Sequence, residues 1–340
     1  MKKKYFFITI PIAILAFLYF NTKKHTIQGD FKRSFIYKKV PVIDTIEFSN
    51  KQEIDGICLD NNVLWINNRN AITKYNGVDG KSKVINARYK DDSKPIINFY
   101  VQNDSLYYFQ ANTKTINVIN TKDLNQRSLA VTFPVTYFIK LKNNTFIFLE
   151  SVIGKASMQV HYKDYDNNQE TVNQDLFSKE IGSGMKYSGS WTYSQGKNTV
   201  FFVPFYDDNI LCFNANGSFN YQFKPIDFQN QDLNIIKENS LFYLSPDANF
   251  IRPSSFSSKA SLFISSYVRS KNQSKNQFKK NSTIDVYDNA NGKYKYSFYI
   301  PKFSGQTAMD FALDDNKILY ASYGFNVVQY NLSEILKDEN

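Results

Sequence analysis

The sequence predicts an all-β protein, a six-bladed β-propeller preceded by an N-terminal membrane-anchor helix. Three observations predict this fold: a strand-length motif that recurs six times, an apolar strand before most of its copies, and a last repeat that is one strand short. Aromatic residues form 16% of the chain and favour strands over helices. Seven blades, or a pair of β-sandwiches, are the alternative arrangements.

The recurring motif is an alternating run that ends in an aromatic or aliphatic residue, usually followed by a polar turn residue. Its six copies end at Tyr75-Asn76, Ile119-Asn120, Tyr162-Lys163, Phe213-Asn214, Tyr287-Asp288 and Tyr330-Asn331. The apolar strands that precede them open at Asn62-Val63, Ser105-Leu106, Thr145-Phe146, Thr199-Val200, Ser261-Leu262 and Lys317-Ile318. These openings lie roughly 40 to 60 residues apart, which is the period of propeller blades.

The repeats divide the chain into successive blades. The expected boundaries are about 54–87, 96–133, 135–176 and 190–228 for the first four blades, a fifth blade ending near Tyr299, and a last repeat at about 308–332. Residues 230–257 fit no complete blade, and we expect them to combine an inner strand with a long loop.

The last repeat supplies only three strands, so the ring needs a strand from elsewhere. Propellers remove the exposed edge of the sheet by closing the ring, and the alternating run at residues 42–48 is the natural donor. The turns between the first and second strands, and between the third and fourth, are short and rich in Gly or Asn. Because the donated strand begins at this tight-turn face, we expect the anchor to join there and the variable face to point away from the membrane.

The N-terminal segment predicts a membrane anchor. Residues 5–20 are uncharged and apolar behind three lysines, and the run ends in bulky residues that suit signal cleavage poorly. We therefore expect a signal anchor at 1–22, a basic linker at 23–41 and the propeller at 42–335. This organisation places the protein in the cytoplasmic membrane with a single pass and a periplasmic or extracellular body. A cleaved signal peptide is the alternative.

Charge is concentrated at the N-terminus. Of the net charge of +10, about +8 belongs to the first 39 residues, which carry nine Lys and Arg side chains and one acid. The basic character therefore belongs to the membrane-proximal segment, and we expect no nucleic-acid partner.

Residues suited to cofactor and metal chemistry are scarce. The chain has two cysteines, Cys58 and Cys212, which we expect to be free, buried thiols in distant blades. Of its two histidines, His25 lies in the linker and His161 is expected at an exposed strand position. There is no CxxC pair, P-loop or dinucleotide-binding glycine pattern. We predict no cofactor, no metal site and no catalytic residue set.

Candidate ligand-binding residues lie on loops of the variable face. The Gly/Ser-rich stretch 181–193 carries Tyr187, Trp191 and Tyr193, aromatic residues that suit sugar or peptide stacking. The loop with Tyr206, Asp207 and Asp208 offers paired carboxylates for a cation or for acid/base work. Packing of Trp191 between blades, and a solvated turn at Asp207-Asp208, are the structural alternatives.

A basic excursion at residues 266–282 divides the fifth blade. It carries Arg269, Lys271 and three further lysines, and no acid, so it could dock an acidic partner. A disordered, solvated loop is the alternative reading.

In its repeat pattern the chain resembles six-bladed β-propellers of the NHL and TolB-like kind over about residues 42–335. The resemblance implies ligand or partner binding at a central or face site and, less often, hydrolase or lyase activity. We expect a binding or scaffolding module for a protein, peptide or glycan partner. An extracytoplasmic hydrolase or lyase with a carboxylate-based site at the channel mouth is the alternative.

Overall fold

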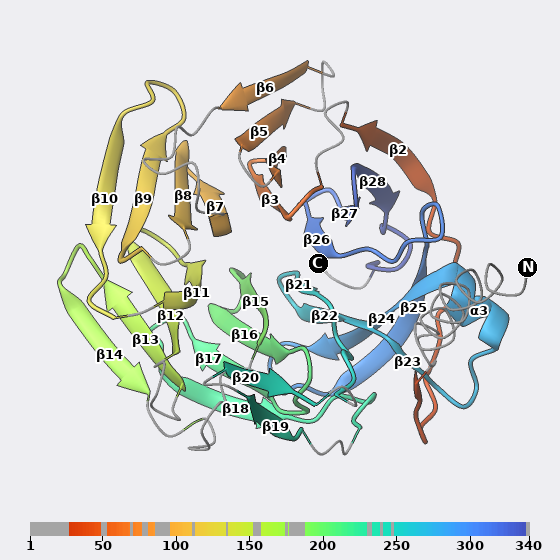
Figure 1. Ribbon diagram of the computed structural model, residues 1–340. Helices are drawn as coiled ribbons and strands as arrows, with labels where there is room; N and C mark the ends of the chain where they lie inside the picture. Colours follow the sequence, from red (N-terminus) through yellow and green to blue (C-terminus); the bar gives the residue numbers. More distant parts are fainter. Residues whose placement is uncertain are drawn as a thin grey trace, which may run out of the picture.

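The computed structural model describes residues 27–48, 53–68, 71–76, 81–85, 96–110, 113–133, 135–151, 158–173, 176, 188–229, 233–238, 241–245 and 248–337. In this part of the chain, six four-stranded sheets surround a central axis, and two two-stranded sheets are additional to them (Figure 1). The six-bladed β-propeller that the repeats predict is therefore confirmed.

Each blade runs from an inner strand at the axis to an outer strand at the rim (Figure 1). Blade 1 comprises β3 (Gly56–Asp60), β4 (Val63–Asn68), β5 (Ala71–Asn76) and β6 (Lys81–Ile85). Blade 2 comprises β7 (Ile96–Gln102), β8 (Ser105–Gln110), β9 (Thr115–Asn120) and β10 (Gln126–Ala130). Blade 3 comprises β11 (Val135–Lys140), β12 (Thr145–Ser151), β13 (Met158–Asp164) and β14 (Gln169–Asn173). Blade 4 comprises β15 (Gly189–Ser194), β16 (Thr199–Pro204), β17 (Ile210–Asn214) and β18 (Phe219–Phe223). Blade 5 comprises β21 (Ser255–Ser257), β22 (Ser261–Ser266), β24 (Asn281–Asp288) and β25 (Tyr294–Pro301). Blade 6 comprises β26 (Asp310–Leu313), β27 (Ile318–Tyr323), β28 (Asn326–Asn331) and the N-terminal strand β2 (Val42–Glu47).

The last blade closes with the donated strand. β2 pairs antiparallel with β28, with Thr45 opposite Val328 and Ile46 opposite Val327. Ile46 is buried with Ile57 and Leu64 of blade 1, so the strand also joins the first blade to the last. The closure that the strand-deficient last repeat predicts is therefore confirmed.

Apolar side chains fill the spaces between blades. The second strands are covered on both faces, and β16 is buried along its whole length because neighbouring blades pack against each side of it. In the contact between blades 3 and 4, Phe202 is fully buried with Leu149 and Val160. Burial of one such side chain contributes about 1.5–3 kcal/mol relative to exposure.

The two ends of the channel differ in their connections. Inner strands finish in tight turns to the second strand, and Asn61, Asn62 and Asn143 adopt positive φ in these turns. Gly217 and Gly292 adopt positive φ in the turns between third and fourth strands, at the same end. We call this the turn end. The opposite end, where the inner strands begin, carries the longer connections and is called the loop end.

Two insertions elaborate blades 4 and 5. Between these blades, β19 (Ile235–Glu238) and β20 (Leu241–Leu244) form a hairpin in the stretch expected to combine an inner strand with a long loop, and β21 is that inner strand. Within blade 5, residues 266–282 contain β23 (Val268–Arg269) and the short helix α3 (Lys275–Lys280). The reading of this excursion as a disordered loop is therefore wrong.

The linker is docked against the body from its first described residue. β1 (Ile27–Gln28) pairs in parallel with β23, and Phe35 forms a parallel bridge with Ser297 of β25. Ile27 thus lies beside the loop-end excursion of blade 5. The chain crosses blade 5 and then enters β2 at the turn end, where Val42 is opposite Tyr330, as the donated strand predicts. The expected junction with the anchor lies outside the described residues.

The predicted anchor at residues 5–20 lies outside the described residues. Among the described residues, no helix has the length and apolar character needed to cross a membrane.

Candidate functional site

The central channel forms a cavity in the described structure. It has a volume of about 600 Å³ and is lined by the inner strands of all six blades. Channels at the centre of a ring are favoured ligand sites because they enclose a ligand and let several strands each contribute a side chain. The two ends of this channel carry different chemistry.

Five polar residues from four blades line the loop-end half of the channel. They are Asn67 of β4, Asn98 and Tyr100 of β7, Tyr137 of β11 and Asp310 of β26, and we call them the Asp310 cluster. The strand β3 lies between these elements: the backbone N–H of Ile57 donates to Asp310 Oδ2 at 2.9 Å. Gly56, the neighbour of Ile57, is opposite Asn67 in the ladder.

β-bulges help to direct two of these side chains into the channel. The register of β7 against β8 shifts between Ile96 and Asn98. The register of β11 against β12 shifts between Val135 and Tyr137. Such bulges re-aim the residue that follows, and they are over-represented next to functional sites. Two neighbouring blades therefore use the same local device at the same level of the channel.

Asp310 is the carboxylate of this cluster. Burial raises its pKa to about 6, while the backbone N–H groups of Ile57 and Phe311 and the Ser254 side chain oppose the shift. These opposing groups are all uncharged. Asp310 therefore titrates close to neutral pH, in the range that suits binding a cation or exchanging a proton.

The amide oxygens of the cluster have unused hydrogen-bonding capacity. Asn67 and Asn98 are 2% and 8% exposed, and the Oδ1 atom of each has no hydrogen-bond partner in the protein. The Asn98 amide lies within hydrogen-bonding reach of the Tyr100 and Tyr137 hydroxyls. Burial raises the pKa of both phenols, so they remain neutral. Buried polar atoms without partners are rare in folded proteins and mark places where another molecule can bind.

The turn end is built from a different set of groups. Asp60 and Asp314 lie there, and burial raises the pKa of each. Lys140, at the end of β11, donates to the backbone oxygen of Leu141 at 2.7 Å, and burial lowers its pKa to about 8. The described lysines that line the channel, Lys140, Lys259 and Lys317, are all at or near this end.

Both cysteines are free thiols, as expected. Cys212 is buried in β17, whereas Cys58 is partly exposed and lines the channel, so the prediction of two buried thiols holds only for Cys212. Desolvation raises the pKa of Cys58 to about 12, which keeps the thiol protonated and makes it a poor nucleophile at neutral pH.

Trp191 and Tyr193 lie on the inner strand β15 and not on a loop before blade 4. Trp191 is 6% exposed, packs against Phe202 with ring centroids 4.8 Å apart, and belongs to the apolar core between blades 3 and 4, which is the packing alternative considered above. It also lines the channel, and its Nε1 atom has no hydrogen-bond partner in the protein. Tyr193 lines the turn-end half, where its hydroxyl donates to Asn198 at 3.0 Å. Tyr187 lies outside the described residues.

Tyr206, Asp207 and Asp208 are placed around Arg252, apart from the channel. The Arg252 guanidinium donates to the Asp207 backbone oxygen at 2.7 Å and to the Asp208 carboxylate at 3.0 Å. Tyr206 packs edge-on against Phe250. Asp208 thus has a structural partner, and the two adjacent carboxylates do not converge on one point: Asp207 accepts from the backbone of Asn209.

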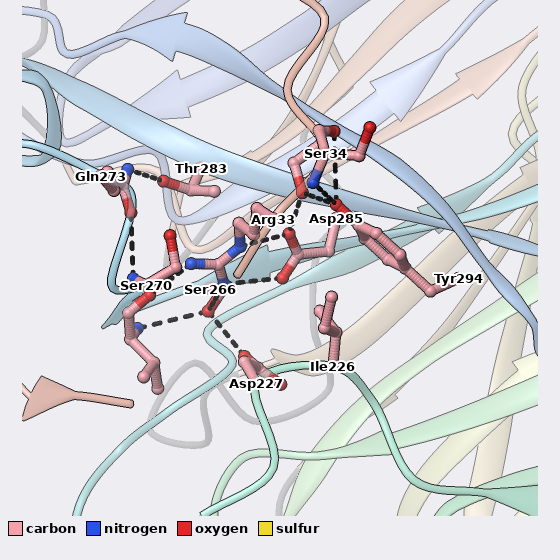
Figure 2. Close-up of polar contacts among 12 residues, drawn as sticks. Arg33, Ser34, Ile226, Asp227, Ser266, Ser270, Gln273, Thr283, Asp285 and Tyr294 are labelled. Atoms are coloured by element: carbon pink, nitrogen blue, oxygen red, sulfur yellow. Dashed lines mark hydrogen bonds and ion pairs between the residues drawn. The ribbon is translucent and has the colours of Figure 1, made fainter. Parts of the chain in front are cut away.

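Arg252 belongs to a buried ionic network that includes the linker. Figure 2 shows Arg33 between Asp285 and Ser266, with Asp227 beyond Ser266. Arg33 donates to both Asp285 oxygens, at 2.6 and 2.8 Å, and Ser266 donates to Asp227 at 2.6 Å. Asp227 also accepts from Arg252 at 2.9 Å. Every nitrogen of the two guanidinium groups donates a hydrogen bond, so this network is satisfied internally and serves the fold.

The predicted basic residues of the excursion contact the linker. Lys271 forms an ion pair with Asp30, and its backbone N–H donates to Phe31 at 2.9 Å. Arg269 lies in β23 and its side chain donates to Gln28. Part of the basic surface expected to receive an acidic partner is therefore used within the chain.

His161 is buried, contrary to the expected exposed position. It is 5% exposed, stacks on Phe133 with centroids 3.8 Å apart, and lies 2.6 Å from the Glu150 carboxylate. Phe133, in the connection between blades 2 and 3, covers one face of the imidazole ring. Among the described residues, no group of three or more His, Cys, Asp or Glu side chains is placed to hold a metal ion.

The Asp310 cluster was missed by the sequence reasoning. Its members come from four blades and have no common spacing in the sequence, and two of them follow β-bulges. One usable signal was the run of polar residues in strands that are otherwise apolar, such as Asn67 and Asn98.

Comparisons with known proteins support the fold alone. A scan against models of protein families and a search of curated proteins both find no match. Among solved structures, a catalytically inactive virginiamycin B lyase from Staphylococcus aureus with quinupristin is 12% identical, with 86% of this chain and 100% of that chain covered and a TM-score of 0.53. A gluconolactonase from Xanthomonas campestris is 10% identical, with 89% and 98% covered and a TM-score of 0.54. The Pan2 WD40 domain from Neurospora crassa is 7% identical, with 89% and 97% covered and a TM-score of 0.53.

These similarities agree with the resemblance that the repeats indicate. The chain is a six-bladed propeller, and its structural neighbours include both enzymes and a WD40 domain. Because similar propellers carry unrelated functions, the function has to be argued from the channel itself.

Proposed function

We propose that the protein is a binding module whose site is the loop-end half of the central channel. One observation carries this proposal: buried amide oxygens of Asn67 and Asn98 line the channel without partners. The Trp191 indole N–H offers a donor deeper in the same channel. Such groups suit a hydroxyl- or amide-bearing ligand, either a glycan or an exposed peptide segment.

Two further observations favour binding over catalysis. The loop-end half has one buried carboxylate, Asp310, among the described residues, and the raised-pKa carboxylates Asp60 and Asp314 lie at the other end. Hydrolysis by two carboxylates needs both of them on one scissile bond. The alternative, a hydrolase or lyase, is supported by the pKa of Asp310, which suits a general base near neutral pH.

The binding proposal predicts a ligand whose affinity depends on the loop end. We expect the chain to bind members of a glycan or peptide array, and Asn98→Ala to weaken binding about tenfold through loss of a buried hydrogen bond. Isothermal titration of array hits measures this effect.

The matched control is Asp315→Asn, which changes an exposed residue at the turn end of the same channel. Blank arrays, or equal weakening by both variants, would contradict the proposal. Chemical turnover of a bound ligand that is lost in Asp310→Asn would favour the enzyme alternative.

We further propose that residues 5–20 hold the propeller in the cytoplasmic membrane with the body outside the cytoplasm. The support is the uncharged apolar run behind three lysines. N-terminal sequencing of the protein from membrane fractions is expected to find an intact N-terminus. A start after about residue 20 in a soluble protein would show that the segment is cleaved.

A further inference from the structure

We propose that the group recognised at the loop end of the channel is an ammonium group, carried by a small molecule or at the end of a side chain. This inference rests on the proposed function, that the loop end is a binding site. The inference specifies the charge of the ligand and the hydrogen-bonding groups that the ligand presents to the site.

Hydrogen-bond acceptors predominate among the groups with free capacity in the cluster. The Asp310 carboxylate and the Oδ1 atoms of Asn67 and Asn98 line one cavity. The strand β3 links them: a Cβ atom at Gly56 would lie 3.6 Å from Asp310 Oδ2, and Asn67 is opposite Gly56 in the sheet. Asn98 uses its amide toward the two phenols, which leaves its oxygen free. An ammonium group has three donors and no acceptor, and it matches three acceptors of this kind.

The charge balance at this end also favours a cation. The described lysines that line the channel are at or near the turn end, and Asp55, immediately before β3, adds an exposed carboxylate at the loop-end mouth. The walls are aromatic, with Phe99, Tyr100 and Tyr137 lining the same part of the channel. Aromatic faces attract organic cations, so both the charges and the walls select a positively charged group.

A monovalent cation fits this site better than a divalent metal ion. Asp310 is the one buried carboxylate of the described loop-end half, and no described cluster has the three His, Cys, Asp or Glu side chains that usually hold a metal. One carboxylate balances one positive charge. Neutral amide oxygens and phenols complete the coordination of an ammonium group without adding charge.

The ionisation of Asp310 sets the expected pH dependence. The titratable groups that face it are Cys58, Tyr100 and Tyr137, all with raised pKa, and Asp55 at the mouth; β21 presents serines and Phe256. Because the pKa of Asp310 is about 6, the carboxylate is charged at pH 7.5 and about nine-tenths neutral at pH 5. Binding of a cation is therefore present above pH 6 and is lost as the pH falls through this value.

The test compares cationic probes with neutral partners of the same shape. The whole chain is titrated with Nα-acetyl-lysine amide against Nα-acetyl-norleucine amide, which lacks the side-chain ammonium group, and with glucosamine against glucose, followed by saturation-transfer NMR and calorimetry. We expect at least one ammonium probe to bind at least tenfold more tightly than its neutral partner at pH 7.5. The advantage should fall about tenfold at pH 5. The two pairs distinguish a side-chain amine from an amino sugar.

Three variants connect the effect to the cluster. Asp310→Asn should abolish the preference for ammonium, and Asp315→Asn at the turn end should leave it unchanged. Gly56→Ala keeps every polar group and places a methyl group in ordinary contact with Asp310 and Phe99, so it should weaken binding without unfolding the protein. Thermal unfolding of each variant checks the fold.

The outcomes separate this inference from the proposed function. Array ligands that depend on Asn98 but show no preference for ammonium would overturn the inference and leave the binding module standing. Blank arrays together with inert ammonium probes would overturn both. Saturable binding of calcium ion alone that Asp310→Asn removes, with no effect of the ammonium probes, would assign the site to a metal and overturn the inference.

Discussion

Replacement of Arg33 by alanine is expected to destabilise the propeller by about 3–5 kcal/mol, the usual cost of leaving a buried charge without its partner. Asp285 is fully buried and receives two hydrogen bonds from the Arg33 guanidinium. Urea unfolding of the wild type and the variant measures the difference. The exposed neighbour provides the control, because Lys32→Ala should change the free energy of unfolding by less than about 0.5 kcal/mol.

The loss of folding stability in Arg33→Ala should depend on pH. Desolvation raises the pKa of Asp285 and Arg33 opposes this shift, so removal of Arg33 raises the pKa further. A carboxylate whose pKa is raised in the folded state destabilises the protein as the pH rises through that value. Arg33→Ala should therefore cost more at pH 7.5 than at pH 5. Equal stability of Arg33→Ala and Lys32→Ala would show that the docked linker contributes nothing to the fold.

Ile46→Asp in the closing strand is expected to destabilise the protein by about 4 kcal/mol. Ile46 is 6% exposed and packs with Ile57 and Leu64 of blade 1. The substitution removes apolar contacts and buries a carboxylate where the adjacent side chains are apolar, so the seam between the first and last blades should open. Thermal and urea unfolding measure the loss, and limited proteolysis detects an opened ring.

Glu47→Ala is the matched control, because Glu47 is the exposed neighbour on the same strand. It should behave like the wild type, since it leaves the strand pairing with Asn326 intact. A small effect of Ile46→Asp would mean that β2 is dispensable, and the view that the ring depends on the donated strand would be wrong.

The linker shows where local reasoning fails. Lysines flank a short polar stretch of the linker, and Arg33 looks like one of several interchangeable basic residues. Its partner Asp285 lies 252 positions away. A basic residue acquires a buried structural role only when the fold presents a carboxylate to it, and that encounter leaves no local pattern.

The roles of the candidate binding residues also depend on partners that are distant in the sequence. The Gly/Ser surroundings of Trp191 predict a ligand-binding residue on a loop. Trp191 does line the channel, but it lies on an inner strand and packs against Phe202. Asp208 is predicted to bind a ligand because it is one of two adjacent acids. In the structure its carboxylate accepts a hydrogen bond from Arg252, so it has a structural role. Neighbours in sequence diverge on a turn, whereas the groups that converge come from different blades.

The sequence alone determined the blades, their order and the closing strand of this protein. Each blade is a local unit whose two-residue alternation, apolar second strand and tight turns are written within about 40 to 60 residues. Only the tertiary structure decided which residues form a site. Asp310 meets Asn67 and Asn98 because ring closure brings the first and last blades together, and because two bulges re-aim side chains at one level of the channel. Desolvation in that channel, and not the local sequence, then sets the pKa of the carboxylate.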